Sequence, residues 1–184
     1  MMEDLAMQLL ELIMNSIHAD SSFIEISIKE SVSRNEIQFI VRDNGKGMDD
    51  ETLKKVTSPF LTSRTTRKVG LGVAFMKGLT EQCNGTFSIK SKVNSGTVIV
   101  ATVERNHWDT PTMGNLGEMM MCSIQANEKI DFLFIYQTDL QKFVFESKEV
   151  KEKIEGVSIL EPDILLWVKE YINQGIQLAK ENRV

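Results

Sequence analysis

Residues 11–28 read ELIMNSIHADSSFIEISI, and the spacing of the apolar residues changes within this stretch. The first half continues a pattern that begins near the N-terminus, with apolar residues three and four positions apart. The second half alternates apolar and polar residues strictly, which is typical of a half-buried strand. The sequence therefore predicts a helix over 3–18 that leads directly into a strand over 23–29.

Two polar residues of this helix, Glu11 and Asn15, lie one turn apart and outside its apolar stripe. A carboxylate in such a position can take a proton from an attacking water molecule, and an amide oxygen can help to bind Mg²⁺ beside phosphate oxygens. Alternatively, both residues belong to the solvated face of an ordinary amphipathic helix. The pair alone leaves both interpretations open.

Three further clusters in the first 100 residues offer a similar choice. Asp43, the first residue of DNGKGM (43–48), ends a strand and can accept a hydrogen bond from the amino group of adenine, or it forms a simple Asx-turn. VGLGVA (69–74) opens a helix, where free N–H groups favour a phosphate, or where the glycines allow close packing. NSGT (94–97) signals a tight turn, which requires no ligand.

The order of the predicted elements indicates the fold class. The first helix and strand are followed by a strand at 37–43, a short helix at 50–57, a loop at 58–69, a helix at 70–82, and strands at 86–93 and 97–104. Such an order predicts a layer of helices on one face of a mixed sheet.

After Arg105 the sequence no longer belongs to the helices and strands described above. A connector with Pro and Gly leads into a predicted helix at 116–126, a hairpin at 130–147 and a long amphipathic helix at 162–181. Their apolar content predicts a small α+β extension, which we expect to pack against the first part. We interpret His107 and Trp108 as packing between the two parts.

Composition narrows the class of protein. The chain has 184 residues and a formal net charge of −5, which does not favour nucleic acid as a partner. Cys83 and Cys122 have no metal-ligand spacing and form no disulfide framework. Since neither a signal peptide nor an apolar stretch of membrane-spanning length is visible, we expect a cytoplasmic protein with no membrane contact.

Read together, the four clusters resemble the GHKL ATPase superfamily of DNA gyrase, heat-shock chaperones of the ninety-kilodalton class, histidine kinases and MutL. ELIMN is similar to its N box, DNGKGM to its G1 box, VGLGVA to its G2 box and SGT to its last nucleotide-binding box. The resemblance covers residues 3–104. It implies the Bergerat ATP-binding fold, an α+β two-layer sandwich, as a domain over 1–105, with 106–184 as the α+β extension of unknown role.

The resemblance also implies roles for individual residues, with ATP and Mg²⁺ as cofactors. Glu11 would be the general base, Asn15 the Mg²⁺ ligand, and Asp43 the acceptor of the adenine amino group. The other residues implied in nucleotide binding are Gly45, Gly47, Met48, Gly70, Leu71, Gly72 and Thr97, with Arg64 or Lys68, or Arg67 between them, in a lid over the triphosphate.

The resemblance does not select one branch of the superfamily. NSIHADSS is closer to MutL and the chaperones, although His18 replaces an acidic residue and Asp20 a glycine, whereas residues 70–97 are closer to histidine kinases and anti-sigma serine kinases. Three functions stay open: hydrolysis of ATP, phosphorylation of a partner in trans, and a non-catalytic module switched by nucleotide. An unidentified protein partner and a homodimer both stay open.

Overall fold

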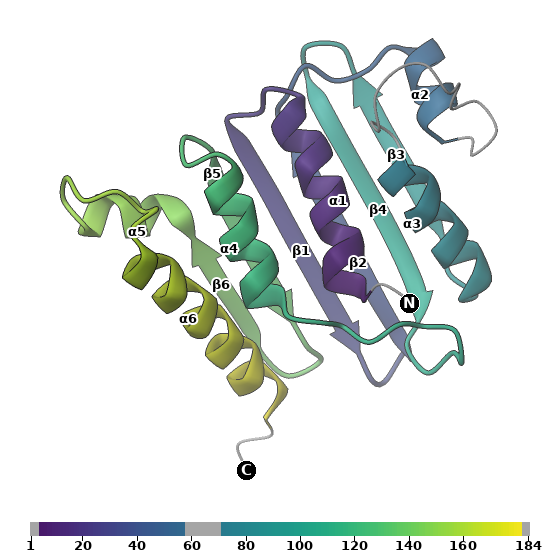
Figure 1. Ribbon diagram of the computed structural model, residues 1–184. Coiled ribbons are helices and arrows are strands. Elements are labelled where there is room, and N and C mark those ends of the chain that lie inside the picture. The colour runs from purple at the N-terminus through teal and green to yellow at the C-terminus, as the bar shows by residue number, and fades with distance from the viewer. Residues whose placement is uncertain (1–3, 58–70, 182–184) are drawn as a thin grey trace.

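The computed structural model describes residues 4–57 and 71–181. All six strands of this part of the chain belong to one mixed sheet (Figure 1). The strand order is β3-β4-β2-β1-β5-β6. β1 pairs with β5 in parallel, and every other neighbouring pair is antiparallel. The strands are β1 (Phe23–Ser31), β2 (Glu36–Asp43), β3 (Phe87–Lys92), β4 (Gly96–Glu104), β5 (Asp131–Gln137) and β6 (Lys142–Glu146).

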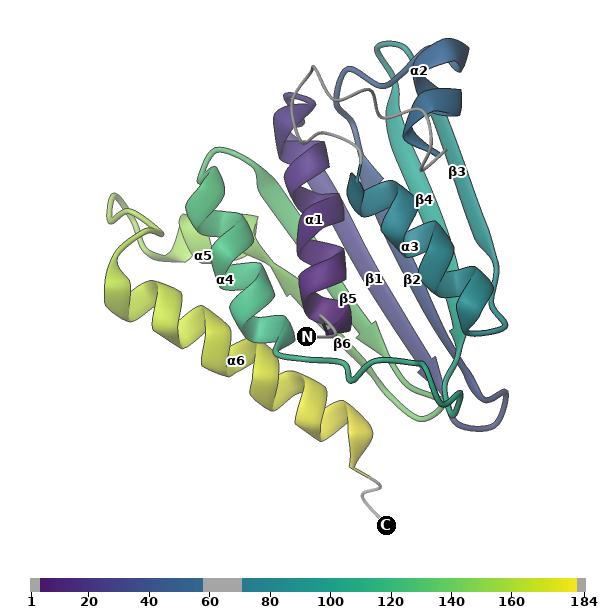
Figure 2. The same ribbon diagram turned by 45° about the vertical axis from the view of Figure 1, so that its right-hand side comes forward.

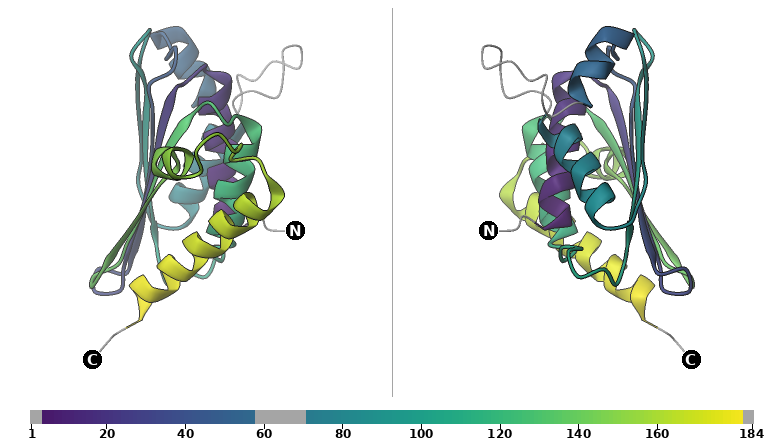
Figure 3. Two further views of the ribbon diagram at one scale, coloured as in Figure 1. Left: turned by 90° about the vertical axis from the view of Figure 1, so that its left-hand side faces the viewer. Right: turned by 90° about the vertical axis from the view of Figure 1, so that its right-hand side faces the viewer.

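Helices cover one face of this sheet, and no described helix covers the other (Figure 3). Figure 2 shows α1 between α3 and α4, with α6 on the far side of α4. The helices are α1 (Leu5–His18), α2 (Asp50–Val56), α3 (Leu71–Gln82), α4 (Leu116–Ala126), α5 (Ser147–Lys153) and α6 (Pro162–Lys180). The predicted fold class, an α+β arrangement of a mixed sheet and one helical layer, is confirmed.

Periodicity explains how α1 and β1 build the core. Alternate residues of β1 point to the helical layer, and Ile24, Ile26 and Ile28 are completely buried there. The apolar stripe of α1 lies on them, and its residues Leu5, Leu9, Leu12 and Ile13 are at most 1% exposed. Burial of each such side chain contributes about 1.5–3 kcal/mol, so this contact fixes α1 over the centre of the sheet.

The C-terminal part extends the same sheet. β5 lies beside β1 along its length, with Phe23 opposite Asp131 and Lys29 opposite Gln137. Phe132, Phe134 and Tyr136 of β5 continue the buried face, and α4 packs on α1. The hydrophobic core is therefore continuous across residue 105, and the division into 1–105 and 106–184 stays a prediction.

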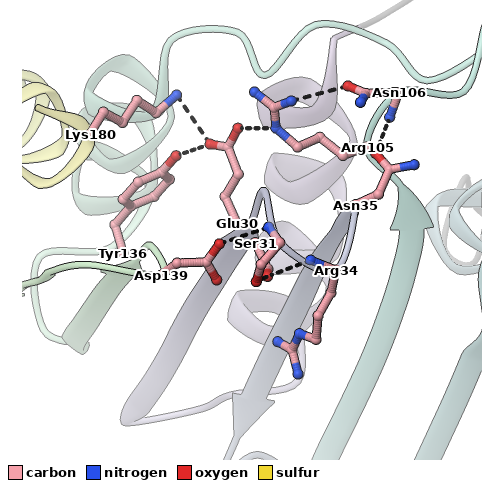
Figure 4. A network of polar contacts seen from close by, with 10 residues as sticks. Glu30, Ser31, Arg34, Asn35, Arg105, Asn106, Tyr136, Asp139 and Lys180 are labelled. Atoms are coloured by element: carbon pink, nitrogen blue, oxygen red, sulfur yellow. Dashed lines mark hydrogen bonds and ion pairs between the residues drawn. The ribbon is translucent and has the colours of Figure 1, made fainter. Parts of the chain in front are cut away.

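A polar network ties the two parts together at one end of β1 (Figure 4). The Glu30 carboxylate accepts hydrogen bonds from Arg105 Nε at 2.8 Å and from the hydroxyl of Tyr136, and Lys180 Nζ lies 3.3 Å from it. Burial by itself would raise the pKa of Glu30, but these donors and the charge of Lys180 together hold that pKa below its ordinary value. Glu30 thus joins β1 to β5 and α6.

Two details differ from the sequence interpretation. The short helix α5 was not predicted, because SKEVKEK carries only one apolar residue, Val150, and has no stripe. The packing role of Trp108 was wrong, since its side chain is 99% exposed. Within 4–57 and 71–181, no helix combines the length and the apolar character needed to cross a bilayer.

Candidate functional site

Asp43 is the most firmly held of the predicted site residues. It ends β2, next to β4, and is 7% exposed. Oδ2 accepts a hydrogen bond from Ser16 Oγ at 2.7 Å, and Oδ1 accepts from the backbone N–H groups of Gly45 at 2.9 Å and Thr97 at 3.2 Å. These bonds connect α1, the β2 end and β4 at a single carboxylate, so its orientation is fixed before any ligand arrives.

Thr97 lies directly opposite Asp43 in the β2–β4 ladder. Its Oγ1 is 2.9 Å from Ser91 Oγ on β3, and the same Ser91 oxygen accepts from Met48 N at 2.9 Å. Met48 therefore lies beside Thr97, although 49 positions separate them in the sequence. The structure brings the predicted second and fourth boxes together through these contacts.

Gly45 and Gly47, which follow Asp43, lie where a side chain would not fit, each for a different reason. A Cβ at Gly45 would lie 2.6 Å from both Ala19 O and Ser21 Oγ, so the loop can approach the end of α1 only without a side chain. Gly47 has a φ of +63°, and a Cβ there would lie 2.0 Å from Lys92 O. Without these side chains the loop lies close to both neighbours, and Lys46 N donates to Ala19 O at 2.8 Å while Lys46 O accepts from Asn94 N at 2.7 Å.

Glu11 and Asn15 face the start of α3. A Cβ on Gly72 would lie 2.9 Å from Glu11 Cβ and 3.6 Å from Asn15 Nδ2, so α3 begins against this face of α1. Glu11 is exposed and Asn15 is partly buried. Within 4–57 and 71–181, neither side chain makes a hydrogen bond or an ion pair. Both are therefore available to a ligand.

Not every predicted residue can be placed. Arg64, Arg67, Lys68 and Gly70 lie outside the described residues. Leu71 is the first residue of α3, and its side chain is 41% exposed. The remaining predicted residues lie at the contact of α1 with α3 or around the end of β2, and the bond from Ser16 to Asp43 links these two places. The lid assignments stay predictions.

Sequence reasoning missed two residues of this arrangement. Ser16 comes four positions after Leu12, on the apolar stripe of α1, and the structure buries it to 5% exposure. A polar residue at a core position of the helix was the signal that could have identified it. Ser91 gave no signal, because its partners Met48 and Thr97 come from other parts of the chain. Ser16 thus positions the Asp43 carboxylate, and Ser91 bonds to both Met48 and Thr97.

The side chains at this site suit a hard cation that takes most of its ligands from phosphate and water and few from the protein. The part of the chain that the structure describes has no cluster of three or more His, Cys, Asp or Glu side chains. Magnesium is commonly held by one or two protein oxygens together with phosphate oxygens and water. The free amide of Asn15 fits that requirement, and Glu11 stands one turn away.

Comparison with known protein families gives one match over this region. The model of the histidine kinase-, DNA gyrase B- and HSP90-like ATPases matches residues 3–107. Among curated proteins, the chain is 36% identical over 89 residues to the sensor histidine kinase YvrG of Bacillus subtilis. It is 32% identical over 88 residues to the sensor histidine kinase ZraS of Escherichia coli K12. These matches cover 46% and 48% of the chain but only 15% and 19% of the relatives.

Solved structures share the fold over a longer part of the chain. The N-terminal domain of a DNA repair protein aligns with a TM-score of 0.54 and 19% identity, over 77% of this chain and 51% of that one. The ATPase domain of Aquifex aeolicus MutL, solved as a complex with ADP, aligns with a TM-score of 0.50 and 15% identity, over 84% and 68%. At these identities the likeness concerns the fold.

Proposed function

The chain belongs to the family of histidine kinase-, DNA gyrase B- and HSP90-like ATPases, and from this premise we propose that it binds ATP with Mg²⁺ and hydrolyses it. The observation that carries the proposal is the free pair of Glu11 and Asn15 against Gly72, next to the fixed carboxylate of Asp43. The ADP complex of the MutL domain, which shares the fold, supports a nucleotide as the ligand.

Asp43 is proposed to recognise the base. Its oxygens are held by Ser16, Gly45 and Thr97, and a carboxylate keeps lone pairs beyond those three bonds. One of them would accept a hydrogen bond from the adenine amino group. Because the carboxylate is already oriented, binding costs little further ordering.

Glu11 is proposed to be the general base. It would take a proton from the water molecule that attacks the γ-phosphorus, while the bond from that phosphorus to the bridging oxygen breaks and ADP leaves with the electron pair. Asn15 would hold Mg²⁺ through Oδ1, and the cation supplies charge stabilisation to the phosphates when bound. Gly72 would let the first N–H groups of α3 approach the phosphates.

The test follows the label of γ-³²P-ATP in the presence of Mg²⁺. Wild type should release free phosphate, and Glu11→Gln should bind nucleotide normally while its turnover falls about 10²–10⁴-fold, as expected for loss of a general base. Asp43→Asn should lose nucleotide binding, measured by calorimetry with ADP. Glu170→Gln, at an exposed position of α6, is the matched control and should behave as wild type.

Full turnover in Glu11→Gln would contradict the assigned role. Intact ATP retained by both wild type and Glu11→Gln would favour a module that is switched by nucleotide without catalysis.

A second candidate is phosphoryl transfer to a partner protein, which the two sensor histidine kinase relatives favour. Glu11 would then activate a side chain of the partner in place of water. In the same assay with candidate partners present, label on a second protein would support this reading, whereas label found only in free phosphate would oppose it.

A further inference from the structure

Strand β6 lies at one edge of the sheet, far from the candidate nucleotide site (Figure 1; Figure 3, left). Thr138 N donates to Gln141 O at 2.8 Å at the start of the β5–β6 ladder. Because hydrogen-bonded and non-hydrogen-bonded pairs alternate in an antiparallel ladder, Val144 directs its N–H and C=O away from β5. These groups find no strand among the described residues and are ready to pair with another one.

The charges of β6 would complement those of a second β6 strand paired with it in antiparallel orientation. It reads Lys142-Phe-Val144-Phe-Glu146, with opposite charges two positions to either side of a central valine. Lys142, Val144 and Glu146 share one face of the strand, since side chains alternate. All three are exposed, and neither charged side chain has an ion pair or hydrogen bond within 4–57 and 71–181.

We propose that β6 is an interface between two copies of this chain, which pair antiparallel about a two-fold axis through Val144. Lys142 then lies opposite Glu146 of the second copy, and Glu146 lies opposite Lys142 of the second copy. Val144 meets its own equivalent at the centre, where the outward N–H and C=O groups exchange hydrogen bonds. Such an interface is isologous, and the two sheets join into one.

The surface beside β6 is apolar enough to support this contact. A hollow of about 410 Å³ lies between β6, α5 and α6. Trp167 and Tyr171 line it, with stacked rings 5.0 Å apart at 15°, and they are 49% and 42% exposed. A second hollow, which Tyr171 also lines, continues along β6 to Gln141. A stable dimer buries about 800 Å² on each partner, so the proposed contact includes this border as well as the five-residue strand.

The other edge of the sheet does not offer the same complementarity. β3 reads Phe87-Ser-Ile-Lys90-Ser-Lys92, and its exposed charges are all positive. Pairing with its own copy would bring lysines together, which is a known way of protecting an edge strand. The charge pattern therefore selects β6 as the edge that accepts a second copy.

The test measures molar mass by light scattering and dissociation constants by sedimentation. Wild type should give about twice the chain mass of 20.9 kDa. Lys142→Glu and Glu146→Lys should each weaken the dimer at least about tenfold, because each places like charges opposite one another. The double variant K142E/E146K should restore the dimer. Lys90→Glu makes the same charge change on β3 and should leave it intact.

Mixing provides the decisive measurement. The Lys142→Glu variant carries two glutamates at the interface and the Glu146→Lys variant carries two lysines. An equimolar mixture should therefore form a heterodimer that is tighter than the dimer of either variant alone. Three results would each overturn the proposal: a wild type that is monomeric at every concentration, a mixture without dimer, or a Lys142→Glu dimer of unchanged affinity. The hollows beside β6 would then be left to another partner. ADP binding should be equal in all variants, so this outcome is separate from the proposed function.

Discussion

At the residue scale, two glutamates of this protein have opposite surroundings. Glu30 is satisfied by Tyr136, Arg105 and Lys180, whereas Glu11 has no partner within the described chain. A fully paired carboxylate stabilises the fold, and a free one beside a glycine is available for chemistry. The two residues should therefore respond differently to the same substitution.

Glu30→Gln should lower the free energy of unfolding by about 1–3 kcal/mol at pH 7, because it removes hydrogen bonds to a charged group. The pKa of Glu30 is lower in the folded protein than its ordinary value of 4.5, so the unfolded state binds more protons in acid. Its contribution is present above pH 4.5 and is lost as the pH falls through the folded pKa. Urea unfolding at neutral and acidic pH measures this.

The difference between wild type and Glu30→Gln should thus shrink in acid, and a difference that does not change with pH would refute the assignment. Glu81→Gln is the control, since the Glu81 side chain is 67% exposed and its pair with Lys77 is 3.9 Å long. Exposed pairs of this kind contribute little, so this variant should stay close to wild type.

At the element scale, the site depends on how closely α3 approaches α1. Gly72 lies at that contact, whereas a Cβ on Gly78 of the same helix would have no atom within 4 Å. A methyl group at the first position must push the helices apart, and at the second it has open space. The two glycines form a natural matched pair.

Gly72→Ala should destabilise the protein by about 1–3 kcal/mol through overpacking and should also weaken ADP binding, because it displaces the first turn of α3 from Glu11 and Asn15. Gly78→Ala should instead stabilise it by about 0.5–1 kcal/mol, since alanine favours an exposed helix over glycine. Urea unfolding and calorimetry with ADP measure both effects. Equal behaviour of the two variants would show that the α1–α3 contact is not tight.

At the scale of the whole molecule, the parallel pairing of β1 with β5 makes the C-terminal part a continuation of the sheet. Without residues 106–184, β1 would become an open edge and the side of α1 that packs on α4 would be exposed. The family match ends near the start of this part, at residue 107, so the added strands lie outside the matched region.

A chain that ends at residue 105 should therefore lose cooperative thermal unfolding and solubility, measured by circular dichroism and by the soluble fraction after expression. The full chain under the same conditions is the control. A soluble, cooperatively folding 1–105 fragment that binds ADP would instead support an independent ATP-binding domain with a separate extension.

The sequence by itself determined the local elements and the boxes of the site. Helical and alternating spacing depend on neighbours within a few residues, so α1, β1, β2, α3, α4 and α6 could be predicted close to their observed bounds. α3 ends at Gln82, two residues before Asn84, which has a φ of +53°, and Gly85 N donates to Thr80 O. Such signals are readable because their physical causes are local.

Only the tertiary structure decided how distant segments meet. The alternating pattern at 130–147 predicts a hairpin but does not determine which strand the hairpin pairs with, because any sheet edge offers the same backbone groups. The bonds from Ser16 to Asp43 and from Met48 to Ser91, and the approach of Gly72 to Glu11, likewise join segments 27 to 61 positions apart. Their geometry follows from packing of α1 and α3 on the complete sheet, which no local pattern encodes.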